Sequence, residues 1–136
     1  MQKSFNEIVD QIVQQNPRYD REAYHFVKEA LEFTIKLRKR GAAEGNHHVN
    51  AAELLEGFRQ LALKEFGPMA WTVLEYWHLE SSEDVGQLVF ALIGAGVFGK
   101  TESDSLEDFR NALDFRAAFV HPFQPTRTSS PGKSSS

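Results

Sequence analysis

The chain has 136 residues, of which 41% are hydrophobic and 25% charged, and its formal net charge at pH 7 is −4. These values predict one globular domain and exclude a wholly disordered, collagenous or membrane-spanning chain. The absence of cysteine excludes a disulfide scaffold, a thiolate zinc site and a cysteine nucleophile. Because the sequence has neither a signal-peptide core nor an 18-residue apolar run, we expect a cytoplasmic protein.

Composition divides the chain into two parts. Residues 124–136 read QPTRTSSPGKSSS and offer no apolar side chain to bury, which predicts a disordered tail. Residues 1–123 form the body. Their apolar periodicity predicts one all-α domain, a compact single bundle of five or six helices in which the second and fifth helices are central.

The first helix is predicted over residues 5–15, because Ser4 and Glu7 fit a capping box and an apolar stripe follows. Asn16 and Pro17 end it. A second helix is predicted over residues 21–40 behind the cap residue Asp20, and its apolar side chains cover an arc of about 200°. An arc of this width indicates contact with helices on two sides.

The third helix is predicted over residues 51–66, opened by Asn50 and Glu53. Gly67 suits a left-handed cap, and Pro68 suits the first position of a further helix over residues 68–79. The tight Gly-Pro joint implies that these two helices meet at an angle.

A fifth helix is predicted over residues 82–94, because Ser81 or Ser82 begins it and acidic residues occupy its first turn. A short strand over residues 88–93 is the competing interpretation. A sixth helix is predicted over residues 105–119, opened by Asp104 and Glu107. We expect a core centred on Phe26, Val27, Leu31, Leu55, Phe58, Val73, Leu88, Val89, Leu92 and Phe109.

The segment from Gly94 to Thr101 fits the phosphate-binding pattern G-x-x-x-x-G-K-T. In a P-loop the backbone amides hold phosphates, the lysine reaches the terminal phosphates and the threonine holds magnesium. The context opposes this interpretation, because a P-loop opens a parallel sheet and too little chain follows Thr101 to build one. We favour a glycine-rich helix exit and keep nucleotide binding as an alternative.

Two further features of the sequence are candidate sites. His47 and His48 are adjacent in a predicted loop, and no converging third or fourth ligand marks them as a metal site. Charge is unevenly spread, with seven basic against four acidic residues in 17–41 and two against nine in 75–114. The candidate contact for nucleic acid or another partner is the basic set Arg18, Arg21, Lys36, Arg38, Lys39 and Arg40.

No constellation for acid–base, nucleophilic or metal chemistry stands out, so we predict no catalytic, cofactor-binding or metal-binding residue and no cofactor. The aromatic content and the divided charge favour a non-catalytic protein-interaction or adaptor module. A nucleic-acid-associated regulator is the alternative, and a nucleotide-binding protein built on Gly94 to Thr101 is the third. The expected partner is a protein rather than a membrane, and the oligomeric state stays open.

Three stretches resemble an uncharacterised family of short bacterial proteins of the planctomycete and verrucomicrobial type. They are RYDREAYHFVKEAL (18–31), HHVNAAELLEGFRQLALKEFGPMAWTVLEYW (47–77) and SEDVGQLVFALIGAGVFGKTESDSLEDF (82–109). At His78 that family more often has glycine, which implies a different end for the fourth helix. The resemblance implies a bacterial protein whose body is one unit, and it transfers no activity or site residue.

Overall fold

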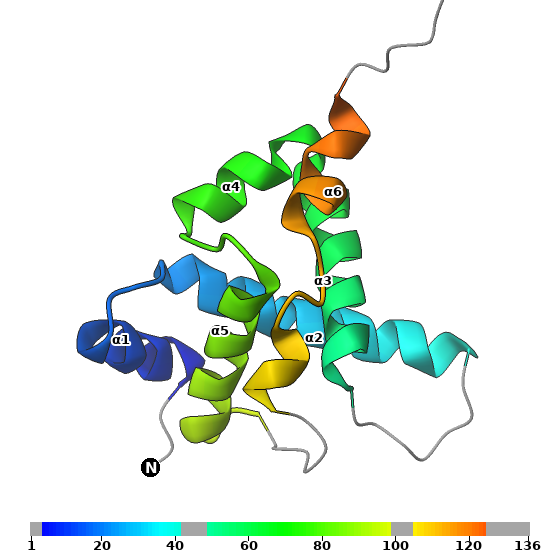
Figure 1. Cartoon of the computed structure of the whole chain (residues 1–136). Coiled ribbons are helices and arrows are strands. Elements are labelled where there is room, and N and C mark those ends of the chain that lie inside the picture. Colours follow the sequence, from blue (N-terminus) through cyan, green and yellow to red (C-terminus); the bar gives the residue numbers. More distant parts are fainter. Residues whose placement is uncertain (1–3, 42–48, 99–104, 125–136) are drawn as a thin grey trace, which may run out of the picture.

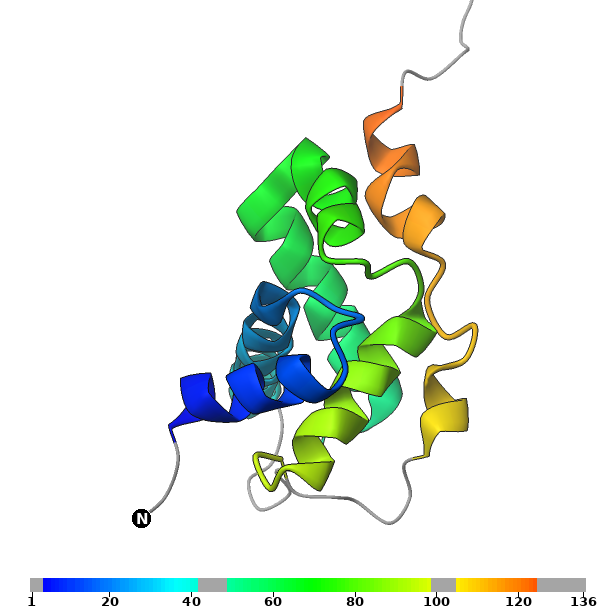
Figure 2. The same ribbon diagram turned by 90° about the vertical axis from the view of Figure 1, so that its left-hand side faces the viewer.

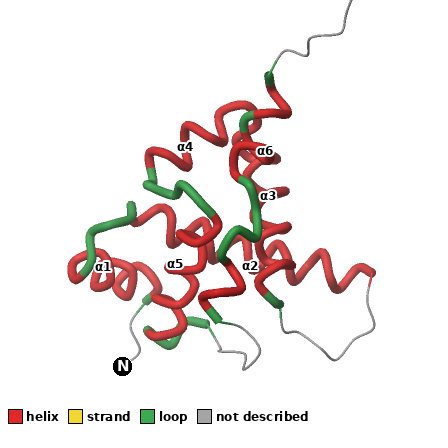
Figure 3. The backbone as a smooth tube through the Cα atoms, viewed as in Figure 1, coloured by secondary structure: helices red, strands yellow, loops and turns green. Residues whose placement is uncertain are grey.

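A computed structural model describes residues 4–41, 49–98 and 105–124. Within these ranges every regular element is an α-helix or a short 3-10 helix, and no strand occurs (Figure 3). The prediction of an all-α fold is therefore confirmed.

The first two helices begin where local capping rules place them. Helix α1 spans Phe5–Gln15, and the side chains of Ser4 and Glu7 exchange hydrogen bonds with each other's backbone amides. Helix α2 spans Arg21–Gly41, and the carboxylate of Asp20 accepts the amide of Glu22 at 2.9 Å. Both predicted starts are confirmed, and α2 runs one residue beyond its predicted end.

The predicted fourth helix begins later and ends earlier in the structure than the sequence predicts. Helix α3 spans Ala51–Phe66 as predicted, but the expected helix over 68–79 is a 3-10 turn, η1 (Gly67–Met69), followed by α4 (Ala70–Tyr76). Helix α4 ends because His78 adopts φ 68°. The amide of Leu79 then bonds back to the carbonyl of Leu74 at 2.9 Å, which completes a Schellman cap.

Helix α5 spans Ser82–Gly94, as predicted, and the competing strand is excluded. It also ends in a Schellman cap, with Gly96 at φ 82° and the amide of Val97 bonded to the carbonyl of Leu92 at 2.9 Å. The glycine-rich exit that the sequence predicts therefore supplies the left-handed residue that this cap needs.

The predicted sixth helix over 105–119 is wrong. The chain instead forms the 3-10 turn η2 (Leu106–Phe109), a break, helix α6 (Phe115–Phe119) and the 3-10 turn η3 (His121–Phe123). Asn111 is left-handed at φ 51°, and Asp114 caps α6 by accepting the amides of Arg116 and Ala117. One continuous helix would put Phe109 and Phe115 about 120° apart around its axis, whereas the break lets both side chains enter the core.

Tertiary bonds stabilise this break. The buried hydroxyl of Ser82 donates to the carbonyl of Phe109 at 2.5 Å and accepts the amide of Ala112 at 3.2 Å. A continuous helix would use these backbone groups internally. At the same junction, a Cβ on Gly86 would lie 2.8 Å from Cβ of Phe109, so glycine lets η2 lie directly on α5.

Helix α2 occupies the middle of the molecule and packs mainly on α3 and α5 (Figures 1 and 2). The crossing with α3 is close, because a Cβ on Gly57 would lie 1.8 Å from the Thr34 hydroxyl oxygen. That buried hydroxyl donates to the carbonyl of Ala30 at 2.7 Å. A helix with neighbours on two sides is what the wide apolar arc of this segment predicts.

An aromatic cluster links the central helix to the end of the chain. The ring of Phe58 lies 5.2 Å from Phe26, 6.1 Å from Phe115 and 6.4 Å from Phe119. Of the predicted core, Leu31 and Val73 are half-buried, and the other residues are buried: Phe26, Val27, Leu55, Phe58, Leu88, Val89, Leu92 and Phe109.

Candidate functional site

One buried carboxylate fixes the start of α5. Oδ2 of Asp84 accepts the backbone amides of Glu80 at 2.8 Å and Ser81 at 3.1 Å. Oδ1 accepts the Tyr19 hydroxyl at 2.6 Å and lies 3.3 Å from the Arg18 guanidinium. The sequence marks Asp84 only as a first-turn acid of a helix, and the structure makes it the point where the α1–α2 linker meets α5.

The linker residue Tyr19 is buried, with 4% of its surface exposed. Burial raises the pKa of its hydroxyl, and the hydrogen bond to Asp84 and that residue's negative charge raise the pKa further. The neighbouring amide of Asp20 donates to the carbonyl of Trp77 at 3.4 Å. Residues 18–20 therefore hold the linker against the end of α4 and the start of α5. The hydrogen bonds named here join elements of the fold to one another.

A polar cleft of about 480 Å³ lies beside this anchor, between the start of α5 and η2. Arg110 on one wall lies 2.9 Å from Glu83 and 3.7 Å from Glu107. Since Arg18 is also paired, with Asp84, both guanidinium groups of the cleft already face carboxylates. The cleft is therefore a network of internal ion pairs rather than a preformed site for an anion.

A larger groove of about 840 Å³ opens between α1 and the C-terminal end of α5, and we call it the α1–α5 groove. One wall carries three large apolar side chains of α1 at helical spacing, Phe5, Ile8 and Ile12. The rest of the lining is Gln11, Gln15, Asn16, Lys28, Ala91, Gly94, Ala95, Gly96 and Val97.

The two walls of the groove differ in the size of their side chains. Helix α1 buries one residue fully, Val9, and Ile8 stays half-exposed on the groove side. The α5 wall is built mainly from alanine and glycine, and a Cβ on Gly94 would meet no atom within 4 Å. The groove therefore offers apolar contacts on one side and room for close approach on the other.

The described part of the segment from Gly94 to Thr101, which fits the P-loop pattern, lines this groove and does not have the setting of a phosphate site. Residues 95–98 follow the end of helix α5, whereas a P-loop follows a strand. No strand occurs in the described ranges. Lys100 and Thr101 lie outside the described residues. The part that is described, Gly94 to Val97, lines the α1–α5 groove through its backbone and small side chains.

The predicted basic contact set is divided between the two ends of α2. Arg18 and Arg21 lie at its start, where Arg18 pairs with Asp84 and Arg21 pairs with Asp10. Arg38 lies near the other end and pairs with Glu53 at 3.3 Å. The stretch of helix between Arg21 and Arg38 is about 25 Å long.

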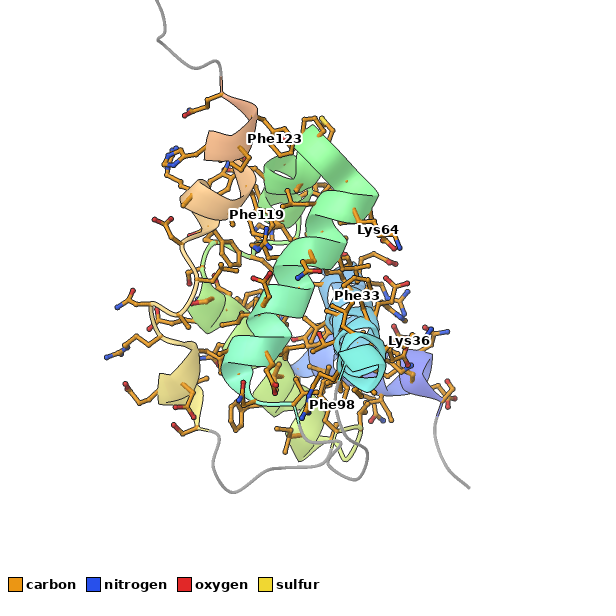
Figure 4. All side chains as sticks on the ribbon, turned by 90° about the vertical axis from the view of Figure 1, so that its right-hand side faces the viewer. Phe33, Lys36, Lys64, Phe98, Phe119 and Phe123 are labelled. Atoms are coloured by element: carbon orange, nitrogen blue, oxygen red, sulfur yellow. The ribbon has the colours of Figure 1, made fainter. Side chains whose placement is uncertain are left out.

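The remaining members of that set do not join the two ends. Lys36 is exposed on α2, where Figure 4 shows it on the same side as Phe33 and Lys64. The ammonium group of Lys64 lies 5.7 Å from the centre of the Phe33 ring. The side chains of Lys39 and Arg40 lie outside the described part. Nucleic-acid binding by this set stays a prediction.

His47 and His48 also fall outside the described residues, so their interpretation as loop residues stays a prediction. Across the ranges that are described, no three His, Asp or Glu side chains gather as a metal site requires. Over the same ranges, no helix has the length and apolar character needed to span a membrane.

Sequence reasoning missed the α1–α5 groove. The sequence feature that could have indicated the groove is the wide apolar face of α1, on which Ile8 and Val13 lie on opposite sides of Val9. Such a face is wider than one neighbouring helix covers. Comparison of the chain with models of known protein families, with curated proteins and with solved structures finds no match.

Proposed function

We propose that this protein is a non-catalytic interaction module that binds an amphipathic helix of another protein in the α1–α5 groove. The observation that carries the proposal is the groove itself, about 840 Å³ of open space with an apolar stripe on one wall and a small-residue surface on the other. Grooves of this construction bind helices by enclosing the apolar side chains of one face.

The dimensions of the groove favour a helix over an extended strand. The stripe from Phe5 to Ile12 covers about two turns, close to 10 Å of α1. A helix laid along it would place residues at its own i, i+3 and i+7 positions against the stripe. The alanine and glycine residues of the other wall would let the backbone of the partner approach closely, whereas an unpaired strand would need backbone hydrogen bonds that a helical wall does not offer.

The rim of the groove is electrically almost neutral. Gln11, Gln15 and Asn16 supply amides, and the ammonium group of Lys28 already lies 2.8 Å from Glu32. We therefore expect affinity to depend mainly on apolar burial and to change little with salt. Binding of nucleic acid by the basic set of α2 would instead weaken steeply as salt rises.

Site-specific crosslinking tests the proposal. p-Benzoylphenylalanine replaces Gln11 on the rim, or Gln14, which is exposed on α1 and does not line the groove. Each full-length variant is irradiated in lysate of the native cells, and mass spectrometry identifies the crosslinked segment. A synthetic peptide of that segment is then titrated into the wild-type protein and into Gly94→Trp, because Gly94 lines the groove and a Cβ placed there meets no atom within 4 Å.

We expect a helical segment to crosslink at position 11 and not at position 14, and Gly94→Trp to weaken binding of its peptide at least tenfold, about 1.4 kcal/mol. Gln14→Trp is the matched control and should bind normally. The proposal is wrong if positions 11 and 14 capture the same proteins, if the peptide binds Gly94→Trp as tightly as the wild type, or if the captured molecule is nucleic acid.

A further inference from the structure

Helix α4 presents a large apolar surface to solvent at a distance from the α1–α5 groove. Met69, at the end of η1, is 56% exposed and Tyr76 is 72% exposed. These residues are seven positions apart, about two helical turns, so they lie on one face with the small residue Thr72 between them. In both views α4 lies above α1 and the end of α5 (Figures 1 and 2).

The C-terminal turn adds a third side chain at this end of the molecule. Phe123 in η3 is 43% exposed, and η3 packs on α6, which contacts α4. Figure 4 shows Phe123 at the same end as the α3–α4 junction. Tyrosine, methionine and phenylalanine are the residue types enriched in the buried centres of protein interfaces.

The flank of this face carries one charge of each sign. The Arg116 guanidinium lies 5.4 Å from the centre of the Trp71 ring, on the N-terminal half of α4. Glu75 is exposed one turn further along. Within the described ranges neither Arg116 nor Glu75 forms an ion pair. Both charges are therefore free to meet opposite charges on another molecule.

We propose that two copies of this chain pair through their α4 faces, antiparallel, about a two-fold axis near Thr72 and Val73. Met69 and Tyr76 are equally distant from that point, so Met69 would pack against Tyr76 of the partner subunit. The same rotation brings Arg116 and Trp71 close to Glu75 of the partner subunit. A parallel two-fold arrangement would put the charged flanks of the two copies on opposite sides of the contact, where Arg116 cannot meet Glu75 of the partner subunit. The charge pattern therefore favours the antiparallel arrangement.

The size of the face sets the strength of this contact. The exposed parts of the three apolar side chains amount to roughly a few hundred Å² per copy, the range of the largest patches on monomers. A stable interface of standard size buries about 800 Å² per partner. We therefore expect a weak, reversible dimer with a dissociation constant between about 1 μM and 1 mM.

Sedimentation of the full chain over a range of concentrations tests the pairing, with Glu75→Arg, Arg116→Glu and the double variant. Each single charge reversal should weaken the dimer about three- to tenfold at low salt, and the double variant should recover most of the loss. Glu65→Arg is the matched control, because Glu65 is exposed on α3 and its charge helps to raise the pKa of Glu29 on α2. Circular dichroism confirms that every variant is folded.

A thiol test is independent of charge. Since the chain has no cysteine, Thr72→Cys introduces a single thiol near the proposed axis. Under mild oxidation this variant should form a covalent dimer faster than Ala52→Cys, whose thiol would be exposed on α3.

Several results would overturn the pairing: a wild-type protein that stays monomeric to about 1 mM, a double charge variant no better than the single ones, or equal crosslinking rates for the two thiols. Loss of the dimer in Gly94→Trp would also overturn it, since the second copy would then occupy the groove. Failure of the groove experiment leaves the pairing intact, because the two surfaces share no residue.

Discussion

At the residue scale, the contacts of Asp84 explain why α5 starts where it does. A buried carboxylate needs several donors to offset its lost hydration. Tyr19, Arg18 and two backbone amides supply them. Because these donors come from residues 18–19 and 80–81, one acid couples the α1–α2 linker to the entry of α5.

Removing one of these donors tests that coupling. Tyr19→Phe keeps the ring in its buried position but leaves Asp84 without its shortest hydrogen bond, at 2.6 Å. We expect a loss of about 1.5 to 3 kcal/mol in the free energy of unfolding, measured by urea denaturation. Tyr76→Phe removes an exposed hydroxyl and serves as the control, with a change below about 0.5 kcal/mol. Equal values for the two variants would show that the Tyr19–Asp84 bond adds nothing.

The same tyrosine gives the fold a dependence on high pH. Burial, the bond to Asp84 and the carboxylate charge raise the pKa of Tyr19, so the folded state keeps its proton more tightly than the unfolded chain. This contribution to stability is complete below pH about 10 and is lost as pH rises above it, by up to about 1.4 kcal/mol per pH unit. In Tyr19→Phe the decline should be shallower. Some slope should persist, because burial also raises the pKa of Tyr24.

His78 is in a conformation that glycine adopts more easily. Its φ of 68° is required by the cap of α4, and the Cβ of a histidine is strained there. We expect His78→Gly to raise the free energy of unfolding by about 1 kcal/mol, measured by thermal and urea unfolding. His78→Ala retains the Cβ and should give no gain. Stabilisation by alanine equal to that by glycine would locate the benefit in removing the imidazole rather than in the backbone.

At the element scale, the sequence predicts best where one local rule decides. Helices α1, α3 and α5 begin and end at their predicted residues, because a cap residue precedes an apolar stripe and glycine or Asn-Pro follows it. The prediction of one continuous helix over residues 105–119 was wrong because the break depends on Ser82, which lies far away in sequence. The α1–α5 groove was missed because the wide apolar face of α1 indicates an uncovered surface but does not indicate that the end of α5 forms the other wall.

Helices α2 and α3 cross at close range, with Gly57 at the crossing. Gly57→Ala would put a Cβ 1.8 Å from Oγ1 of Thr34, which forces the helices apart. We expect a loss of about 3 kcal/mol on urea unfolding. In the double variant with Thr34→Ala the nearest atom becomes the Cβ at 3.0 Å, so at least half of the loss should be recovered. Strict additivity of the two single changes would show that this crossing does not limit packing.

At the scale of the whole molecule, the proposed binding surfaces leave the core uninterrupted. The aromatic cluster runs from α2 through α3 to α6, and Phe26 also lies 5.4 Å from Trp77 beyond the end of α4. Elements that share one such cluster cannot lose their packing independently. The described residues should therefore unfold as one unit, although α6 and η3 are short and lie near the end of the chain.

This expectation can be checked with Phe58→Leu in a Trp71→Phe background, where Trp77 is the remaining tryptophan and its fluorescence can be excited selectively at about 295 nm. Phe58 is fully buried and joins α3 to α2 and α6, so its truncation should cost about 1 to 2 kcal/mol. Far-UV circular dichroism and Trp77 fluorescence should give the same midpoint before and after the change. Phe123→Leu, the same replacement at a 43% exposed position, should shift neither signal. A fluorescence midpoint that separates from the dichroism midpoint would mean that the α4 and α6 end unfolds first, because Trp77 reports on that end while most of the helix signal comes from α2, α3 and α5.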